Sequence, residues 1–441
     1  MSYAARLFEL RDSARTFLVG ERSVSYEQAA KEVMEMSSSV AAGETVVHFA
    51  TNSVQSVLHY LALQWAGARV VAVDPLTSAE DLKFILEDSS PFLIIASEDV
   101  MNREKEVLKG YRVVTSLGRG SGNNEPYTYH KNEVGLIYYY AGIAGRTMQV
   151  LHSGESSYLN ARALAKSTGL NEVRTALLVP LAHVLGNSVL GVTLALGGSL
   201  LIIPKFEPWK LASSIQEFRL NYLSAVPQVF EALLEVNGDL SSLSLCVSSA
   251  APLRMEVQRR FLSKFGRVIT QQYGFTEGMV LTFLKPELWE TGAVGSPLED
   301  VRLKVKDGEL MVRAPWLMLG YSDEEETKKV WEEGWLKTGD LVKVIDDLVY
   351  FTGVKKRMLK FKGYPIFPKD LEAILRRHPA VSEVRVVGEE VEGLGQQPVA
   401  LVVAKERRAG LEEELLNFVN SRVAIYKRVK RVQLVDSIGP E

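Results

Sequence analysis

Short apolar runs rich in β-branched residues alternate with longer amphipathic stretches through the first 120 residues of the chain. The runs have the length and composition of strands, and the stretches between them follow the helical period. Strands and helices alternating at this spacing are typical of a largely parallel sheet covered by helices. The predicted strands are residues 45–50, 68–73 and 92–96, and the predicted helices are residues 54–66 and 78–88, the second capped by Ser78.

The same alternation continues to about residue 290, and the pattern then changes twice. Short β runs separated by turns follow Gly292 and predict a small, β-barrel-like part, whereas a basic segment after Gly353 leads into a small α/β unit. We therefore expect an α/β protein with a large N-terminal domain of stacked, mostly parallel sheets and helices, residues 1–353, and a small C-terminal α/β domain, residues 354–441. The further predicted strands are residues 135–140, 177–179, 200–203, 222–226, 301–305, 309–312, 348–351, 381–387 and 398–403; helices are expected at 368–378 and 411–423, and a surface linker at 119–123.

From Ala176 to Pro204 the chain carries no charged residue, and a stretch of this length could span a bilayer. Proline and glycine divide the stretch at Pro180, Gly186 and Gly191. The pieces have the lengths of a buried strand, a loop, a helix and a second strand in an α/β core. We therefore expect no membrane span.

The composition, 46% hydrophobic and 24% charged residues, is that of a globular protein, and the net charge of −3 gives no reason to expect a nucleic-acid partner. The single cysteine, Cys246, excludes an internal disulfide and a cysteine-rich metal site, and its apolar neighbours favour a buried structural role. No apolar signal-peptide core follows Met1, so we expect a cytoplasmic protein. The sequence does not indicate an oligomeric state.

The pentapeptide Tyr273-Gly274-Phe275-Thr276-Glu277 combines an aromatic ring, a glycine, a hydroxyl and a carboxylate after a strand-like run. A ring can stack on a purine, and a glycine lets the backbone approach a ligand. A hydroxyl can hydrogen-bond phosphate, and a carboxylate offers the hard oxygen that Mg²⁺ prefers. These residues predict a nucleotide site. The alternative is a turn in which Thr276 and Glu277 stabilise the start of a helix.

Three further stretches carry residues that suit a ligand site. His183 lies in an apolar run, where it is either a ligand-facing loop residue or a core histidine. The small residues 248–253 form either a ligand-facing turn or a tight turn between a strand and a helix. Asp340 ends the run Thr338-Gly339-Asp340, where its carboxylate could accept two ribose hydroxyls or belong to an ordinary β-turn.

With residues 52–76, 292–297 and 360–368, these stretches resemble, in order and spacing, the adenylate-forming superfamily of acyl-CoA synthetases, peptide-synthetase adenylation domains and luciferases. The resemblance covers nearly the whole chain. It implies that Tyr273 stacks on adenine, that Thr276 contacts the α-phosphate, and that Asp340 holds the ribose. It also implies that His183 gates the pantetheine tunnel near the acyl carboxylate, that residues 52–76 are scaffold, and that the C-terminal domain is mobile and rotates between two half-reactions.

The resemblance thus implies ATP or AMP, Mg²⁺, coenzyme A and a small-molecule carboxylic acid as cofactors and substrates. Glu277 is the implied metal ligand, and Thr276, Glu277 and His183 are the implied catalytic residues. The implied nucleotide-binding residues are Gly142, Gly145, Arg146, Thr147, Ala250, Ala251, Pro252, Gln272, Tyr273, Gly274, Asp340 and Lys355. The implied acyl- and coenzyme A-binding residues are His183, Val184, Val226, Lys360, Lys362, Gly363 and Tyr364, although a solvated surface would equally account for the lysines.

The sequence departs from the family pattern where the family has its cationic groups. The family's phosphate loop reads Ser-Gly-Thr-Thr-Gly-x-Pro-Lys-Gly, and residues 141–149 keep its first two glycines but have Met148 in place of the lysine. Val354 stands where the family has a ribose-contacting arginine, and Arg357 where it has a hinge aspartate. The family's C-terminal catalytic lysine has no counterpart before Glu441.

We therefore expect an AMP-forming acyl-CoA synthetase for a fatty or aryl acid in which adenylation is impaired, because such losses of charge contacts cost about 100- to 1000-fold each. A non-catalytic relative that binds a nucleotide or acyl-CoA, as a sensor or assembly partner, is the alternative. A third possibility is an enzyme that forms or hydrolyses thioesters with an adenylate made elsewhere.

Overall fold

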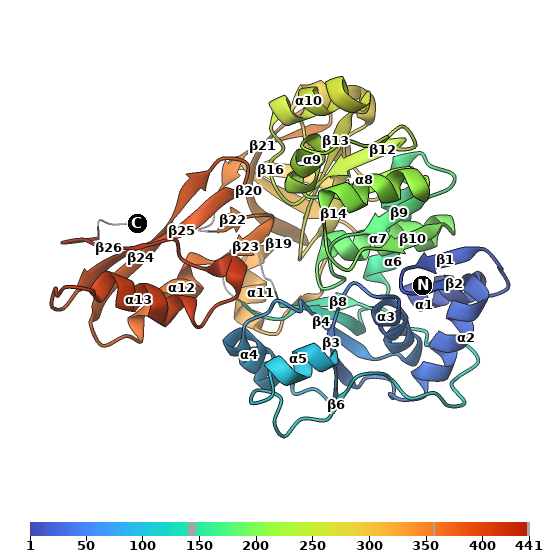
Figure 1. The fold of residues 1–441 in the computed structure, drawn as a ribbon, viewed down its shortest axis with the longest axis horizontal. Helices are drawn as coiled ribbons and strands as arrows, with labels where there is room; N and C mark the ends of the chain where they lie inside the picture. The colour runs from blue at the N-terminus through green and yellow to red at the C-terminus, as the bar shows by residue number, and fades with distance from the viewer. Residues whose placement is uncertain (140–146, 356–357, 439–441) are drawn as a thin grey trace.

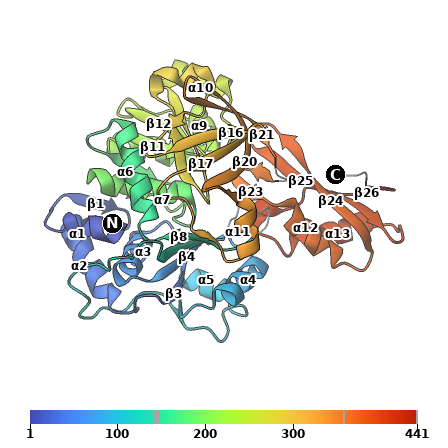
Figure 2. The same ribbon diagram turned by 180° about the vertical axis from the view of Figure 1, so that it is seen from behind.

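The computed structural model describes residues 1–139, 147–355 and 358–438. It confirms the predicted class, an α/β protein of stacked sheets with helices. Figures 1 and 2 show the orange-to-red end of the chain as a lobe beside a larger body. We call residues 358–438 the C-terminal unit, which buries a hydrophobic cluster of its own, and the described residues before them the large unit. The domain boundary between residues 353 and 354 stays a prediction.

One sheet of the large unit is parallel over most of its width. Its strands are β3 (Thr45–Phe49), β4 (Arg69–Val73), β5 (Leu93–Ile95), β6 (Val113–Val114), β7 (Val134–Tyr138), β8 (Val150–Ser153) and β18 (Gly320–Tyr321), in the order β18-β8-β7-β4-β3-β5-β6. Alternate residues enter different clusters, because successive side chains of a strand point to opposite faces. Val46 packs with helix α3 (Val54–Ala66) on one face, and Val47 packs with α4 (Ala79–Ser89) and α5 (Glu98–Arg103) on the other. Ser78 caps α4, as predicted.

Two further sheets complete the core of the large unit. One has the order β2-β1-β10-β9, with β1 (Thr16–Val19), β2 (Ser23–Ser25), β9 (Arg174–Leu177) and β10 (Ser199–Ile202). The other has the order β11-β12-β13-β14-β15, with β11 (Tyr222–Ala225), β12 (Leu245–Ser248), β13 (Ile269–Phe275), β14 (Met279–Phe283) and β15 (Ser296–Pro297). Their helices are α6 (Ser156–Thr168), α7 (Val184–Leu196), α8 (Pro208–Glu217), α9 (Pro227–Leu234) and α10 (Met255–Phe265), and a 3-10 turn spans Pro286–Thr291. Cys246 is buried beneath α9 and α10, and burial raises the pKa of its thiol to about 12.

The uncharged stretch 176–204 folds as predicted into the end of β9, a loop, helix α7 and strand β10. Gly186 allows α7 to begin against this loop, since a Cβ there would lie 2.3 Å from the Val179 carbonyl oxygen. Within the described ranges, no helix is both long and apolar enough to cross a membrane.

The short β runs after Gly292 form an antiparallel sheet in the order β16-β17-β20-β19, with β21 beside β20. Its elements are β16 (Arg302–Lys306), β17 (Glu309–Arg313), α11 (Glu324–Val330), β19 (Trp331–Glu332), β20 (Trp335–Ile345) and β21 (Leu348–Val354). The C-terminal unit packs helices on a sheet of order β23-β22-β25-β24, with β26 beside β25. Its elements are β22 (Leu359–Phe361), β23 (Tyr364–Ile366), α12 (Pro368–Arg376), β24 (Val381–Val391), β25 (Gly395–Ala404), α13 (Leu411–Asn420), a 3-10 turn (Ile425–Lys427) and β26 (Val432–Leu434).

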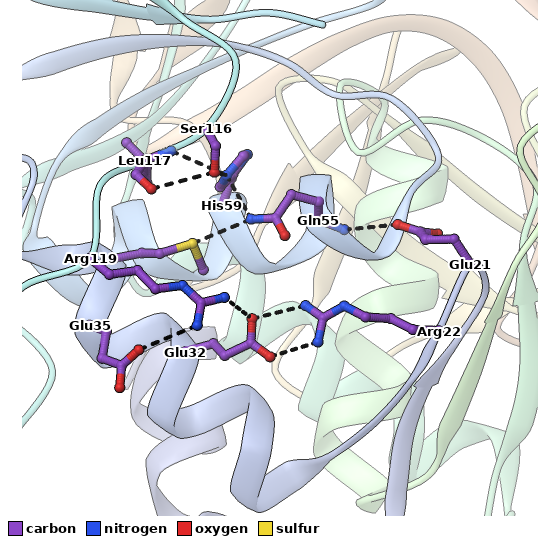
Figure 3. A network of polar contacts seen from close by, with 10 residues as sticks. Glu21, Arg22, Glu32, Glu35, Gln55, His59, Ser116, Leu117 and Arg119 are labelled. Carbon is purple, nitrogen blue, oxygen red and sulfur yellow. Dashed lines mark hydrogen bonds and ion pairs between the residues drawn. The ribbon is translucent and has the colours of Figure 1, made fainter.

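The N-terminal elements include four that the sequence analysis did not predict: helix α1 (Tyr3–Glu9), the two strands of the hairpin β1–β2, and helix α2 (Tyr26–Ser37). Helix α2 follows the hairpin, and Figure 3 shows how polar contacts tie it to the predicted linker. Glu32 of α2 accepts hydrogen bonds from Arg22, at 2.7 and 2.9 Å, and from Arg119, at 2.7 Å. The linker is exposed, as predicted, but its start is fixed to the helix.

Candidate active site

A cavity of about 200 Å³ lies between the large unit and the C-terminal unit. We call residues 272–277 with Asp340 the β13 wall, and residues 360–365 the C-terminal edge. Both contribute to the lining, together with apolar residues from the loops around α7 and α9. The lining residues are Tyr138, Val179, Ala182, His183, Val184, Leu185, Val226, Ser249, Ala250, Gln272, Gly274, Phe275, Thr276, Val280, Asp340, Met358, Lys360, Lys362, Gly363, Tyr364 and Pro365.

The β13 wall is a hairpin, so the alternative of a turn that leads into a helix is wrong. Strand β13 continues to Phe275 and pairs with β14 in antiparallel fashion, with a register shift between Tyr273 and Gly274. At this shift the strands approach so closely that a Cβ on Gly274 would lie 2.1 Å from the Met279 carbonyl oxygen. The glycine is therefore needed for the fold of the wall, whatever ligand it faces.

Tyr273 and Asp340 are hydrogen-bonded to each other across the wall. The Tyr273 hydroxyl donates to Asp340 Oδ2 at 2.5 Å, and Asp340 lies in strand β20 rather than in a β-turn. Burial, together with the Asp340 carboxylate, raises the pKa of Tyr273 well above its usual value, so the phenol keeps its proton. Asp340 lines the cavity and Tyr273 does not, and the predicted stacking of Tyr273 on adenine stays a prediction.

Thr276 and Glu277 follow at the tip of the wall. Thr276 lines the cavity, and its carbonyl oxygen lies 2.9 Å from Nε2 of the fully buried His152. Burial lowers the pKa of His152 to about 4, so the imidazole is neutral near pH 7 and donates this hydrogen bond. Glu277 is fully buried and accepts a hydrogen bond from the Tyr321 hydroxyl at 2.8 Å.

The described residues contain no group of three or more histidine, cysteine, aspartate or glutamate side chains that could hold a metal ion. A lone carboxylate can hold Mg²⁺ together with a nucleotide, because this ion takes one or two protein carboxylates and completes its shell with phosphate oxygens and water. Glu277, however, is fully buried and is not among the residues that line the cavity. The role of Glu277 as a metal ligand stays a prediction.

His183 pairs with a carboxylate that the sequence analysis assigned to the scaffold. Its Nε2 lies 2.6 Å from Oδ2 of Asp74, which directly follows β4 and is fully buried. Burial alone would raise the pKa of Asp74, but the hydrogen bonds from His183 and from the Leu76 amide outweigh it and lower that pKa. The histidine is thus neither a plain core residue nor a simple lining residue.

The C-terminal edge closes the cavity opposite the β13 wall. The Tyr364 ring contacts the His183 ring edge to face, with centroids 5.4 Å apart. Lys360 Nζ donates to the Ala250 carbonyl oxygen at 2.8 Å, and Gly363, at φ +82°, packs against Val226 of the large unit. The cavity lining includes Lys360, Lys362, Gly363 and Tyr364. The alternative that the two lysines only form a solvated surface is therefore less favoured.

The C-terminal unit is also held to the large unit at α4. Lys427 lies 2.9 Å from Asp81 Oδ2 although its side chain is only 4% exposed, and Arg377 pairs with Glu80. A second contact runs from α10 and α9 to the loop after β24. Arg254 lies 2.9 Å from Glu392, and this pair is largely exposed.

Several predicted nucleotide-binding residues do not line the cavity. Ala251 and Pro252 are outside the lining, whereas Ala250 is part of it and adopts φ +70°, which is unusual for a residue other than glycine. The Lys355 side chain pairs with Glu309 at 3.1 Å. Gly142, Gly145 and Arg146 lie outside the described residues.

The described end of the predicted phosphate loop is engaged in contacts with protein groups. Met148, at the position of the family's lysine, is 5% exposed and belongs to the core. The Thr147 hydroxyl donates to Asp370 of the C-terminal unit at 3.0 Å, and the Gln149 amide donates to Asp88 at 2.8 Å. None of these three side chains lines the cavity.

Sequence reasoning missed Asp74, Tyr321 and His152, which position His183, Glu277 and Thr276. One signal was available for Asp74, since a polar residue at the carboxyl end of a parallel strand is where α/β proteins commonly place ligand-facing groups. Tyr321 and His152 had no comparable signal, because each is far from its partner in the sequence.

Comparisons with known proteins agree with this geometry. The family described as "AMP-binding enzyme" matches residues 9–322, and the family "AMP-binding enzyme C-terminal domain" matches residues 370–439. The chain is 29% identical to 4-coumarate–CoA ligase-like 2 of Arabidopsis thaliana, over 90% of this chain and 80% of that protein.

Two solved structures have nearly the same fold. The o-succinylbenzoate CoA synthetase of Bacillus subtilis, bound with a product analogue, matches with a TM-score of 0.90 at 24% identity, over 99% of this chain and 96% of that one. A malonyl-CoA ligase in a ternary product complex with methylmalonyl-CoA and AMP matches with a TM-score of 0.85 at 26% identity, over 97% of both chains.

Proposed function

Because this chain belongs to the AMP-binding enzyme family and is similar to acyl-CoA ligases, we propose that it joins a carboxylic acid to coenzyme A through an acyl-adenylate. ATP would supply the adenylate, and Mg²⁺, held in part by Glu277, would neutralise phosphate charge. The arrangement of the cavity supports this proposal, since the β13 wall and the C-terminal edge face each other across one space.

The acid in this proposal is a fatty or an aryl acid. Val179, Ala182, Leu185 and Val280 are among the lining residues and give the cavity an apolar side.

Adenylation is the weaker half-reaction in this proposal. The observation that carries it is the core position of Met148, together with the hydrogen bond from Thr147 to Asp370. Transfer of a phosphoryl-type group depends on positioned cations and donors, and these side chains supply none to the cavity. Thioester formation depends on the other side, where Lys360, Lys362 and Tyr364 line the cavity.

The test compares the two half-reactions with a panel of small aryl and short-chain acids. Pyrophosphate exchange with ATP measures adenylation, and thioester formation from synthetic acyl-adenylate and coenzyme A measures transfer. We expect transfer to be measurable and exchange to be at least about 100-fold slower. Fast exchange would contradict the impaired step, and no thioester from any adenylate would contradict the ligase. Asp340→Asn is the control that should weaken both reactions.

The second candidate is a non-catalytic relative. It is favoured by the same observation, that Met148 is buried in the core and Thr147 is hydrogen-bonded to Asp370. Such a protein would bind AMP or an acyl-CoA without turnover, and thermal stabilisation by these ligands with no product would identify it. The expected cytoplasmic location stays a prediction.

A further inference from the structure

Strand β13 presents alternate side chains to the cavity. Gln272 and Gly274 line the cavity, whereas Gln271 and Tyr273 do not, and the side chains of these last two have hydrogen-bond partners elsewhere in the protein. Successive side chains of a strand point to opposite faces. Gln272 therefore lies on the face of β13 that is turned to the cavity.

The side-chain amide of Gln272 has no comparable partner. Gln272 is 4% exposed, and in the described part of the chain neither its Nε2 nor its Oε1 takes part in a hydrogen bond. The nearby Ser249 hydroxyl does not serve the amide, because it donates to the Gln272 backbone carbonyl oxygen at 3.4 Å. Leaving both ends of a buried amide unpaired is costly, and native proteins keep few such groups, so this one calls for a ligand that pairs with it.

Gln272 belongs to the floor of the cavity, at the carboxyl edge of parallel strands. Strands β11, β12 and β13 are parallel and in register at Ala225, Ser248 and Gln271. The residue that follows each of these lines the cavity, namely Val226, Ser249 and Gln272. The carboxyl edge of parallel strands is where α/β proteins commonly place ligand-facing groups. This floor combines an apolar side chain with one unpaired amide, which suits a hydrocarbon group that carries a single polar substituent.

The chemistry of an amide narrows the choice of substituent. Its nitrogen donates hydrogen bonds and its oxygen accepts them. A hydroxyl group can accept from the nitrogen or donate to the oxygen, so it matches the amide in either orientation. A carbonyl oxygen can only accept and an ammonium group can only donate. A hydroxyl is therefore the uncharged small substituent that fits this amide best.

We propose that the acid carries a hydroxyl group away from its carboxylate, and that Gln272 selects for this hydroxyl by hydrogen bonding to it. This inference rests on the proposed ligase function and names the acid more closely. The family resemblance implies instead that Gln272 contacts the nucleotide, so the experiment measures the two parts of the ligand separately.

The experiment measures the affinity of non-hydrolysable acyl-adenylate analogues, acyl-sulfamoyl adenosines, by calorimetric titration. The acyl groups come from benzoic and phenylacetic acids with and without a ring hydroxyl at each position, and from hexanoic and decanoic acids with and without a terminal hydroxyl. All analogues share one nucleoside, so differences in affinity within a pair report the acid. We expect at least one hydroxylated analogue to bind about 10- to 100-fold more tightly than its parent, because its hydroxyl pairs with the amide.

Gln272→Leu keeps most of the side-chain volume and removes the amide. In this variant the hydroxylated analogue should bind no more tightly than its parent, because its hydroxyl would be buried without a partner. The affinity for AMP should stay within about 2-fold of that of the wild type, since no contact with AMP is removed. Thermal denaturation should show unchanged or raised stability, because an apolar group of similar shape replaces an unpaired amide.

Gln258→Leu is the matched control. Gln258 is 1% exposed, and its Oε1 also has no hydrogen-bond partner among the described residues, but it lies in α10 and does not line the cavity. This variant should keep the wild-type preference for the hydroxylated analogue.

Single-turnover thioester formation from the corresponding acyl-adenylates and coenzyme A separates this inference from the ligase proposal. If no adenylate forms a thioester, the ligase proposal fails, and the binding preference still decides the role of Gln272. If thioesters form but no hydroxylated analogue is preferred, or if Gln272→Leu keeps the preference, the inference alone is overturned. It is also overturned if no analogue binds, or if Gln272→Leu weakens AMP and every analogue equally, because the residue would then serve the nucleotide.

Discussion

The β13 wall and the C-terminal edge face the same cavity but are built in different ways. The wall consists of paired strands of one unit, with Glu277 fully buried and a backbone approach that only Gly274 allows. The edge is a short hairpin of the C-terminal unit, placed by side-chain contacts such as Lys360 with Ala250 and Lys427 with Asp81. The wall is therefore preorganised by the fold, whereas the position of the edge depends on a few contacts between units.

The largest effect expected is from Gly274→Ala in the wall. The new Cβ would lie 2.1 Å from the Met279 carbonyl oxygen, and neither backbone strand can move without breaking the pairing of β13 with β14. We expect a loss of more than about 3 kcal/mol in the free energy of unfolding and no binding of AMP. Chemical denaturation and calorimetric titration measure both.

Gly353→Ala is the matched control, because its Cβ would meet nothing closer than Leu341 Cδ1 at 3.9 Å. It should change stability by less than about 0.5 kcal/mol. Equal stabilities of the two variants would show that the close approach in the wall is not the constraint we infer.

The wall was predictable from sequence and its supports were not. The residue types of 273–277 and the strand before them are local signals, and most of the predicted strands and helices of the α/β core were confirmed in the same way. The predicted strand 177–179 was misplaced, because β9 ends at Leu177. Asp74 and His183 are 109 residues apart, and Tyr321 and Glu277 are 44 residues apart. Such pairs form only when strands far apart in the sequence become neighbours in the fold. A single sequence does not show which distant residues will meet.

Lys427→Met should break the docking of the edge rather than the fold of either unit. The substitution keeps most of the volume but removes the cation that pairs with Asp81 and whose charge favours the ionised form of the half-buried Asp370. Removing one partner of a buried ion pair costs about 3–5 kcal/mol of stability. Because Asp81 is partly exposed, we expect a loss of stability of about 3 kcal/mol, at the low end of this range.

Limited proteolysis between the units, with denaturation followed in parallel, measures this loss. Lys430→Met is the control, because its pair with Glu389 lies within the C-terminal unit and is exposed. Unchanged protease resistance of Lys427→Met would mean that the α4 contact does not place the edge.

Lowering the pH should destabilise the folded protein in part through His152, which is hydrogen-bonded to the β13 wall. Burial lowers its pKa to about 4, below the ordinary value of about 6.5, so between these values the unfolded chain binds a proton that the folded protein does not. Stability is therefore lost as the pH falls from about 6.5 to about 4, by up to about 1.4 kcal/mol per pH unit for this group. His152→Gln should reduce that slope, as measured by urea denaturation at pH 7.5, 6 and 5.

His48 and His59 contribute in the same direction, since burial lowers their pKa values to about 3 and about 4, so the variant removes only part of the slope. His130→Gln, at an exposed position, is the control. If His152→Gln leaves the pH dependence of the unfolding free energy unchanged, then groups other than His152 take up the proton on unfolding.

Gly363→Ala tests the edge by the same kind of substitution as Gly274→Ala tests the wall. The residue has φ +82°, which costs an alanine about 1–2 kcal/mol, and its Cβ would meet the Val226 side chain at 3.1 Å, which can yield. We expect a loss of about 1 kcal/mol in stability, slower thioester formation and unchanged AMP binding. An effect on AMP binding as large as that of Gly274→Ala would remove the distinction between wall and edge.

The smallest effect expected is from Arg254→Ala, at the exposed side of the junction. Arg254 bridges Glu231 at 3.2 Å and Glu392 at 2.9 Å, but the Glu392 side chain is 89% exposed, so water and salt screen the pair. We expect a loss of about 0.5 kcal/mol that vanishes in 0.5 M salt, and little change in thioester formation. Glu392→Gln should behave in the same way. A loss of stability as large as that of Lys427→Met would contradict this expectation. It would mean that the exposed and the buried contacts hold the C-terminal edge equally well.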